Sequence, residues 1–151
     1  MSVMMANNEV GSIQPVKELA DIAHNNGALF HTDAVQAVGH IEIDVKALGV
    51  DMLSASAHKF NGPKGIGLLY IKKGINVKPF MDGGAQERGV RAGTENVASI
   101  IGMAVALEKN CKKIVHFKNK MNDLEKLLLL KLDNLNVKYF RNGALNIFLE
   151  I

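Results

Sequence analysis

The chain has 151 residues, of which 48% are hydrophobic and 22% are charged, and its formal net charge is +3. This composition indicates a folded globular protein with one core and excludes a disordered polyelectrolyte. Its apolar runs are too short to span a bilayer, so we expect no membrane partner. The basic residues gather between Lys109 and Lys120 without regularly interleaved aromatic rings, which predicts a solvated helix face and no nucleic-acid partner.

The single cysteine, Cys111, excludes an internal disulfide and is typical of a reducing compartment. Residues 1–6 carry no charged leader segment and are too short for the apolar part of one, so we expect no signal peptide. These two features predict a cytoplasmic protein.

The first part of the chain alternates predicted strands and helices. Buried strands are expected at Ser2–Ala6 and Ala28–Asp33, with the polar loop Asn7–Gly11 after the first. Between them, Pro15 suits the first turn of a helix and Gly27 suits its C-terminal cap. This alternation predicts an α/β layer architecture. The next predicted elements are a turn or short helix at 34–39, a short helix capped by Asp44 and ending at Gly49, and buried strands at 50–54 and 66–71.

A polar corner, with Ser56, His58 and Lys59, separates the last two of these strands. Asp33 ends the preceding strand, and ligands of open α/β sheets collect at the carboxyl ends of strands. A lysine and an aspartate so placed suit pyridoxal phosphate. The lysine can form a Schiff base with its aldehyde, and the aspartate can pair with its pyridine nitrogen. The alternative is an ordinary corner with an incidental lysine, in which Asp33 only caps the following turn.

The pattern changes after Pro79. Residues 81–94 are glycine-rich and are expected to form a functional loop. A long helix is predicted from Thr94 or Glu95 to Leu135, with a kink left open, because apolar residues recur there at seven-residue spacing. Strands are expected at 137–140 and 145–151 around an Asn142–Gly143 turn. The predicted division is a first domain at 1–93, a connecting helix at 94–135 and the start of a second domain at 136–151.

Four segments resemble the signature blocks of cysteine desulfurases, which are pyridoxal-phosphate enzymes of the class V aminotransferase superfamily. They are Asn7–Gly11, His31–Gln36, Ser56–Lys59 and Glu87–Asn96, in the family's order and close to its spacing. The last block is more similar to the NifS/IscS-like branch than to the SufS-like branch. The resemblance covers most of the chain. It implies an α/β fold, namely part of the large cofactor domain of a fold-type I, aspartate aminotransferase-like enzyme, followed by the start of a smaller α+β domain.

The resemblance also implies roles for the matching side chains. Lys59 would carry the cofactor and then act as the acid–base group, while Asp33 would pair with the pyridine nitrogen. The other implied cofactor contacts are the amides of Asn8 and Gln36, the phosphate ligands Ser56 and His58, and Thr94, which would reach the phosphate bound mainly by the other subunit of a homodimer. Capping is the alternative for Asn8, Gln36 and Thr94, and a structural histidine is the alternative for His58. His31 is expected to be structural or to support the site, and no metal site is expected.

The implied reaction removes sulfur from L-cysteine and leaves alanine and an enzyme persulfide for Fe–S cluster or other sulfur-carrier biosynthesis. The implied partner is a sulfur-acceptor or scaffold protein. The family's phosphate loop, catalytic cysteine loop and carboxylate-binding arginine have no counterpart here, which predicts an internal fragment that is inactive alone. Cys111 borders the apolar helix stripe and is expected to be packed there rather than to act as the nucleophile. The alternatives are another class V enzyme, such as a selenocysteine lyase or an aminotransferase, or a non-enzymatic remnant.

Overall fold

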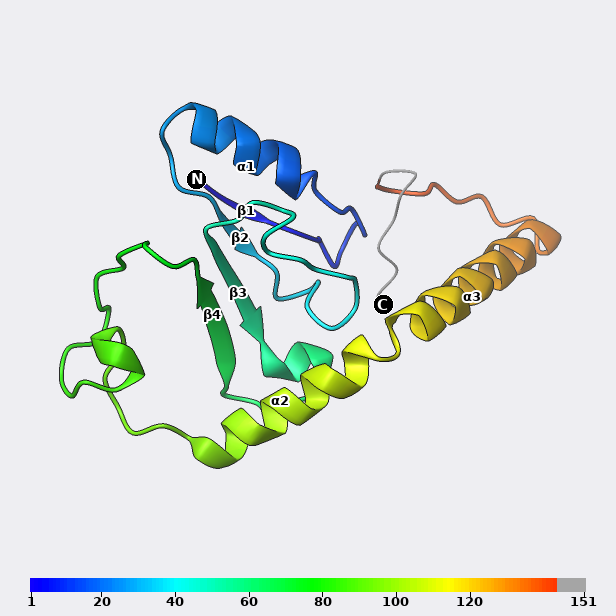
Figure 1. The fold of residues 1–151 in the computed structure, drawn as a ribbon. Helices are drawn as coiled ribbons and strands as arrows, with labels where there is room; N and C mark the ends of the chain where they lie inside the picture. The colour runs from blue at the N-terminus through cyan, green and yellow to red at the C-terminus, as the bar shows by residue number, and fades with distance from the viewer. Residues whose placement is uncertain (144–151) are drawn as a thin grey trace.

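The computed structural model describes residues 1–143, which form a four-stranded sheet flanked by helices and a long helical arm that leads away from it (Figure 1). The regular elements in chain order are β1 (Ser2–Met4), α1 (Val16–Asn25), β2 (His31–Asp33), β3 (Met52–Ser56), the 3-10 helix η1 (Ala57–Phe60), β4 (Gly67–Ile71), the 3-10 turn η2 (Glu87–Gly89), α2 (Val97–Cys111) and α3 (Ile114–Asn134).

The sheet order is β1-β2-β3-β4, so neighbours in the sheet are also successive strands in the sequence. β1, β2 and β3 run parallel, whereas β4 is antiparallel to β3. Asp33 is level with Met4 on one side and with Ser54 on the other. The three parallel strands therefore end at one edge of the sheet. β4 begins at that same edge, where Gly67 lies opposite Ser56.

One face of the sheet carries the core. Thr32, Leu53 and Ala55 are almost fully buried and alternate along their strands with half-exposed residues. The rest of the buried apolar core comprises Met5, Ala6, Val16, Ala20, Ala23, Phe30, Ala34, Ala37, Val38, Val50, Ala57 and Phe60. The opposite face of β2 and β3 presents the half-exposed side chains of His31, Asp33, Met52, Ser54 and Ser56.

A buried carboxylate joins α1, β2 and the end of β4. Asp51 is only 3% exposed. Its Oδ2 accepts hydrogen bonds from Phe30 N (2.9 Å) and from His24 Nε2 (2.8 Å), and its Oδ1 accepts one from Lys72 Nζ (3.4 Å). Burial alone would raise the pKa of this carboxyl. The hydrogen bonds from Phe30, His24 and Lys72, together with the charge interaction with His24, outweigh burial and hold the pKa of Asp51 below its ordinary value.

The strands lie close to their predicted positions, but two short elements differ. Residues 44–49 form hydrogen-bonded turns and not the predicted helix. Asp44 still caps this segment, because its Oδ1 accepts from the backbone of Lys46 (2.8 Å) and Ala47 (3.1 Å), and these bonds lower its pKa. Residues 137–140, predicted as a strand, pair with no other strand within residues 1–143, and Phe140 is 94% exposed. The strand predicted at 145–151 lies outside the described residues.

The predicted long helix is two helices. α2 begins at Val97, after Asn96 caps it by accepting from Ser99 N, so neither Thr94 nor Glu95 starts it. The helix is interrupted at Lys112 and Lys113, and α3 carries the chain onward as the arm in Figure 1. No helix within residues 1–143 is long and apolar enough to cross a membrane.

Candidate functional site

The sheet edge where the parallel strands end gathers most of the predicted site residues. Asp33 is the last residue of β2 and Ser56 is the last residue of β3, and His58 and Lys59 follow directly in η1. Asn8 lies in the turn that follows β1, with its side chain exposed. Parallel strand ends brought together in this way form the usual ligand-binding edge of an α/β sheet.

Asp33 is half-buried and already oriented by the backbone. Its Oδ1 accepts from Val35 N at 3.0 Å, so the carboxylate caps the turn at 34–39. This is the capping role that the sequence left open. The bond fixes the direction in which the carboxylate faces, which a ligand-binding carboxylate also needs. Gln36 lies within the same turn and is half-buried.

His31 ties three strands together next to Asp33. One ring nitrogen, Nδ1, lies 2.7 Å from the Ser2 hydroxyl on β1, and Nε2 lies 3.2 Å from the Ser54 hydroxyl on β3. His31 and Asp33 are two residues apart and point to the same face of the sheet. The histidine therefore supports the strand that carries the aspartate, as the sequence predicted.

The Lys59 corner, residues 56–62, is built from alternating buried and accessible residues. Ala57 and Phe60 are buried and anchor η1, whereas His58 is exposed and Lys59 is half-buried. The Ser56 hydroxyl lies 2.9 Å from His58 Nδ1, so the two side chains form one polar unit. A hydroxyl, an imidazole and an ammonium group together complement an anionic ligand such as a phosphate ester.

Two side chains outside the predicted set of site residues hold this corner. His40 Nε2 donates to Lys59 O at 2.7 Å, and Asn110 Nδ2 donates to Phe60 O at 2.7 Å. His40 carried no local signal, because its partner is distant in sequence. Asn110 did carry one. It follows the apolar Ala106 and Leu107 at helical spacing, so a polar residue falls on the inward face of α2.

Thr94 belongs neither to the strands nor to η1. It is exposed and belongs to the loop between η2 and α2 (Figure 1). The glycine-rich segment 81–94 also contains η2, where two consecutive non-glycine residues have positive φ, Glu87 (49°) and Arg88 (59°). Such conformations are strained for L-residues and are common at functional positions.

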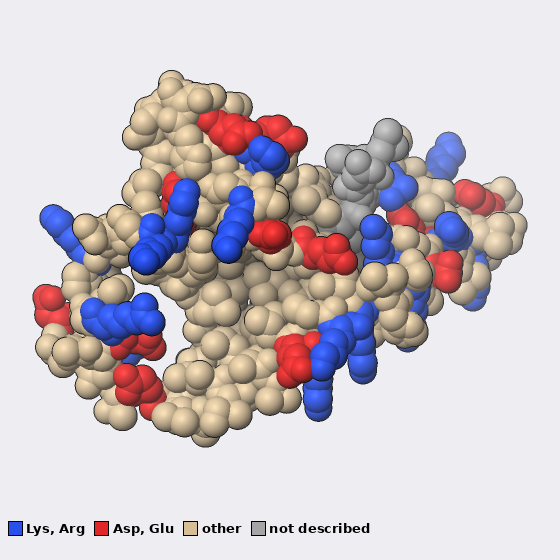
Figure 2. Space-filling view, in the orientation of Figure 1, with Lys and Arg blue, Asp and Glu red and all other residues tan. Residues whose placement is uncertain are grey.

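Cys111 is exposed at the last position of α2, which corrects the prediction that it packs in the helix. The apolar face of α2 that packs on the core is formed instead by Met103, Ala106 and Leu107. The visible face in Figure 2 mixes acidic and basic side chains, so no single-sign stripe covers it. Within residues 1–143, no three side chains of histidine, cysteine, aspartate or glutamate come together as a metal site.

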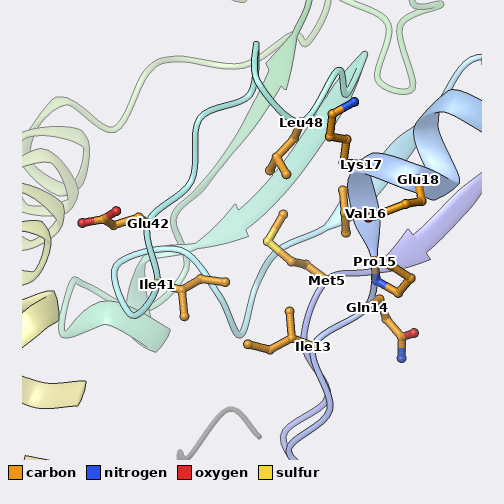
Figure 3. Close-up of a pocket in the computed structure, with 10 residues that line it drawn as sticks. All are labelled: Met5, Ile13, Gln14, Pro15, Val16, Lys17, Glu18, Ile41, Glu42 and Leu48. Atoms are coloured by element: carbon orange, nitrogen blue, oxygen red, sulfur yellow. The ribbon is translucent and has the colours of Figure 1, made fainter. Parts of the chain in front are cut away.

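A separate hollow lies between the start of α1 and the turns at 41–48 (Figure 3). Its volume is about 210 Å³, and its apolar lining includes Met5, Ile13, Pro15, Ile41 and Leu48. It contains none of the predicted site residues and offers few polar groups. The candidate site is therefore the sheet edge at Asp33 and Lys59 and not this hollow.

A family model for class-V aminotransferases matches residues 1–144. The chain is 59% identical over 108 residues to "Cysteine desulfurase IscS" of Methanosarcina thermophila, a match that covers 72% of this chain and 27% of the relative. A solved "NifS-like protein" superposes with a TM-score of 0.84 at 46% identity, over 89% of this chain and 37% of that one. A structure titled "SspA in complex with cysteine" superposes with a TM-score of 0.68 at 41% identity, over 71% and 31%. The chain thus spans between 27% and 37% of the length of these three relatives.

Proposed function

This chain belongs to the class V aminotransferase family, and from that premise we propose that it forms part of a pyridoxal-phosphate-dependent cysteine desulfurase of the NifS/IscS-like kind. The relatives' names support the reaction, and the relative solved with cysteine supports L-cysteine as the substrate. The observation that supports the proposal is that Asp33 ends β2 and that Lys59 follows the end of the neighbouring parallel strand β3.

The residues at this edge fit the proposed cofactor. The polar unit of Ser56 and His58 matches a phosphate group, and the oriented carboxylate of Asp33 matches a protonated ring nitrogen. Bound pyridoxal phosphate would supply an electron sink for the substrate's α-carbon. Gln36 and Asn8 would donate amide hydrogen bonds, and Thr94 would contribute across a homodimer.

Each side chain then has a defined task. Asp33 would keep the proton on the ring nitrogen, because its negative charge stabilises the protonated form. Lys59 would hold the cofactor through its ε-amino group and, once released, would move the proton at the substrate α-carbon. Ser56 and His58 would orient the cofactor by its phosphate. Cys111 lies on α2, outside this constellation, and is not proposed as the nucleophile.

The remaining parts of the proposal concern the whole protein. We place the cofactor domain at 1–93, a connecting helical region at 94–135 and the start of a smaller domain at 136–151. The protein would act as a homodimer in the cytoplasm and pass sulfur to an acceptor or Fe–S scaffold protein.

The test is to reduce a mixture of the protein and pyridoxal phosphate with borohydride and to map the labelled peptides. We expect the label on Lys59, because this residue is half-buried and follows Ser56 and His58 at the strand ends where Asp33 also lies. Lys64 and Lys72 serve as internal controls, since both are exposed. Label on either control in preference to Lys59 would contradict the proposal.

A further inference from the structure

Two side chains hold consecutive carbonyl oxygens at the Lys59 corner. His40 binds the carbonyl of Lys59 itself and Asn110 binds the carbonyl of Phe60, each at 2.7 Å. A carbonyl oxygen only accepts, so His40 must carry its hydrogen on Nε2 in this bond. The last carbonyls of a helix have no partner within that helix. These two bonds therefore fix the end of η1 from outside.

Asn110 is the more fully engaged of the two. It is 7% exposed, and its Nδ2 donates both to Phe60 O and to Ala106 O, at 2.8 Å. Its Oδ1 accepts from Asn61 Nδ2 at 3.1 Å. Only an amide supplies two donor hydrogens and an acceptor at one position, since a carboxylate cannot donate and leucine can do neither. The side chain thus fastens the end of α2 to the corner.

The chain is tightly packed where these contacts meet. Gly39, next to His40, has φ +83°, and a Cβ placed on it would lie 2.7 Å from Phe60 Cβ and 3.4 Å from Asn110 Cβ. On the other side of the corner, the backbone N–H groups of Asn61 and Gly62 both donate to Ala57 O. The backbone at Lys59 is therefore held before and after the lysine.

The geometry points to Asn110 as a positioning residue for Lys59, an inference that rests on the proposed function. Asn110 does not act on the cofactor. It sets the backbone of η1 and hence the direction in which the Lys59 side chain leaves it. Because Asn110 is the penultimate residue of α2, just before the interruption at Lys112 and Lys113, it also couples the placement of the helical arm to the aim of the lysine.

The first measurement is amide hydrogen exchange in the full 151-residue chain. Asn110→Leu preserves the size of the side chain and removes all three hydrogen bonds. We expect exchange at Gly62 N to become about tenfold faster than in the unaltered chain, while amides paired within β2 and β3 stay unchanged. Asn26→Leu is the matched control. Asn26 Nδ2 also donates to a carbonyl four residues back, Ile22 O, but on α1, away from the corner.

The second measurement is the ratio of borohydride-trapped pyridoxal phosphate on Lys59 to that on Lys64. A purely structural role would leave this ratio unchanged in folded protein, whereas a positioning role predicts a severalfold fall in Asn110→Leu and none in Asn26→Leu. If Asn110→Leu does not fold, Asn61→Gly takes its place. Asn61 is exposed, has φ 64° and provides one of the three bonds, and glycine suits that φ.

The outcomes separate the two claims. Unchanged exchange at Gly62, or an equal rise throughout β3, overturns the claim that Asn110 holds the Lys59 corner. Faster exchange with an unchanged labelling ratio overturns the positioning role. A lack of Lys59 preference in the unaltered chain instead refutes the proposed function, and the exchange measurement still decides whether Asn110 holds the corner.

Discussion

Asp51 is expected to be the most important single charge for the stability of the sheet. It is buried and receives three hydrogen bonds, from Phe30 N, His24 and Lys72. Asp51→Ala leaves a buried backbone N–H without its partner and removes the acceptor that His24 and Lys72 share. Because the side chains of His24 and Lys72 are 36% and 51% exposed and regain water, the cost is that of a lost buried acceptor, about 2–3 kcal/mol of unfolding free energy. Asp51→Asn can still accept from Phe30 but loses the charge, so we expect a loss of about 1–2 kcal/mol.

The dependence on pH follows from the same contacts. The pKa of Asp51 is lowered in the folded protein, so its stabilisation is fully present above the unfolded value of about 3.9 and is lost as pH falls through the folded pKa. The difference in stability between the unaltered chain and Asp51→Asn should therefore be constant at neutral pH and shrink below about pH 4.

The assay is urea unfolding followed by circular dichroism at several pH values. Asp21→Ala is the control, because Asp21 pairs with Lys17 at 3.0 Å on the exposed surface of α1. Such a pair contributes at most about 0.5 kcal/mol. An Asp51→Ala chain that unfolds at the same urea concentration as Asp21→Ala would refute the view that the buried carboxylate joins α1 to the sheet.

Two backbone predictions follow from positive φ angles. Gly39→Ala should lower the unfolding free energy by about 2–4 kcal/mol, from backbone strain and from overlap with Phe60. Gly27→Ala, at φ +69° with open space around it, should cost only about 1 kcal/mol. Equal losses of unfolding free energy in urea titrations of the two variants would disprove the overlap at Gly39. Arg88→Gly should leave stability unchanged or raise it by up to about 1 kcal/mol, whereas Arg88→Val should lower it by about 1–2 kcal/mol, because β-branched residues disfavour φ 59°. Equal melting temperatures for these two variants would show that the loop carries no strain at Arg88.

The strands and the polar corner were predictable because their signals are local. Each strand is a short apolar run that ends in polar residues, and Asp33 and Lys59 stand at such ends. The sequence order of the strands also became their order in the sheet. The reversal of β4 relative to β3 is consistent with the short connection at residues 57–66, because a parallel crossover needs about a dozen residues or more.

The interruption between α2 and α3 could not be predicted from the spacing of the apolar residues. Leu107 and Ile114 keep the seven-residue spacing across it, although Lys113 leaves the helical conformation at φ −115°, ψ 2°. A break that preserves the phase of the apolar stripe leaves the pattern intact. The exposure of Cys111 has the same origin, because the stripe predicts which residues share a helix face but not how far the packed surface extends along the helix.

The predicted strand at 137–140 failed for another reason. Its residues have suitable β-propensity, but a strand is stabilised by pairing, and the described residues provide no adjacent strand for it. Val137 and Phe140 are consequently exposed. Propensity therefore identified a segment able to form a strand, while the pairing that decides the matter depends on residues elsewhere in the chain.

The contacts that refine the candidate site are long-range, which is why the motifs alone could not predict them. The blocks locate Lys59 on a corner, but the bonds that hold its backbone come from His40 and Asn110, 19 and 50 residues away from the carbonyls that they bind. A motif specifies the groups that could meet a ligand. The orientation of those groups is set by side chains that lie outside the motif. A chain with the same block but a different residue at position 110 would therefore carry the same lysine on a less firmly held corner.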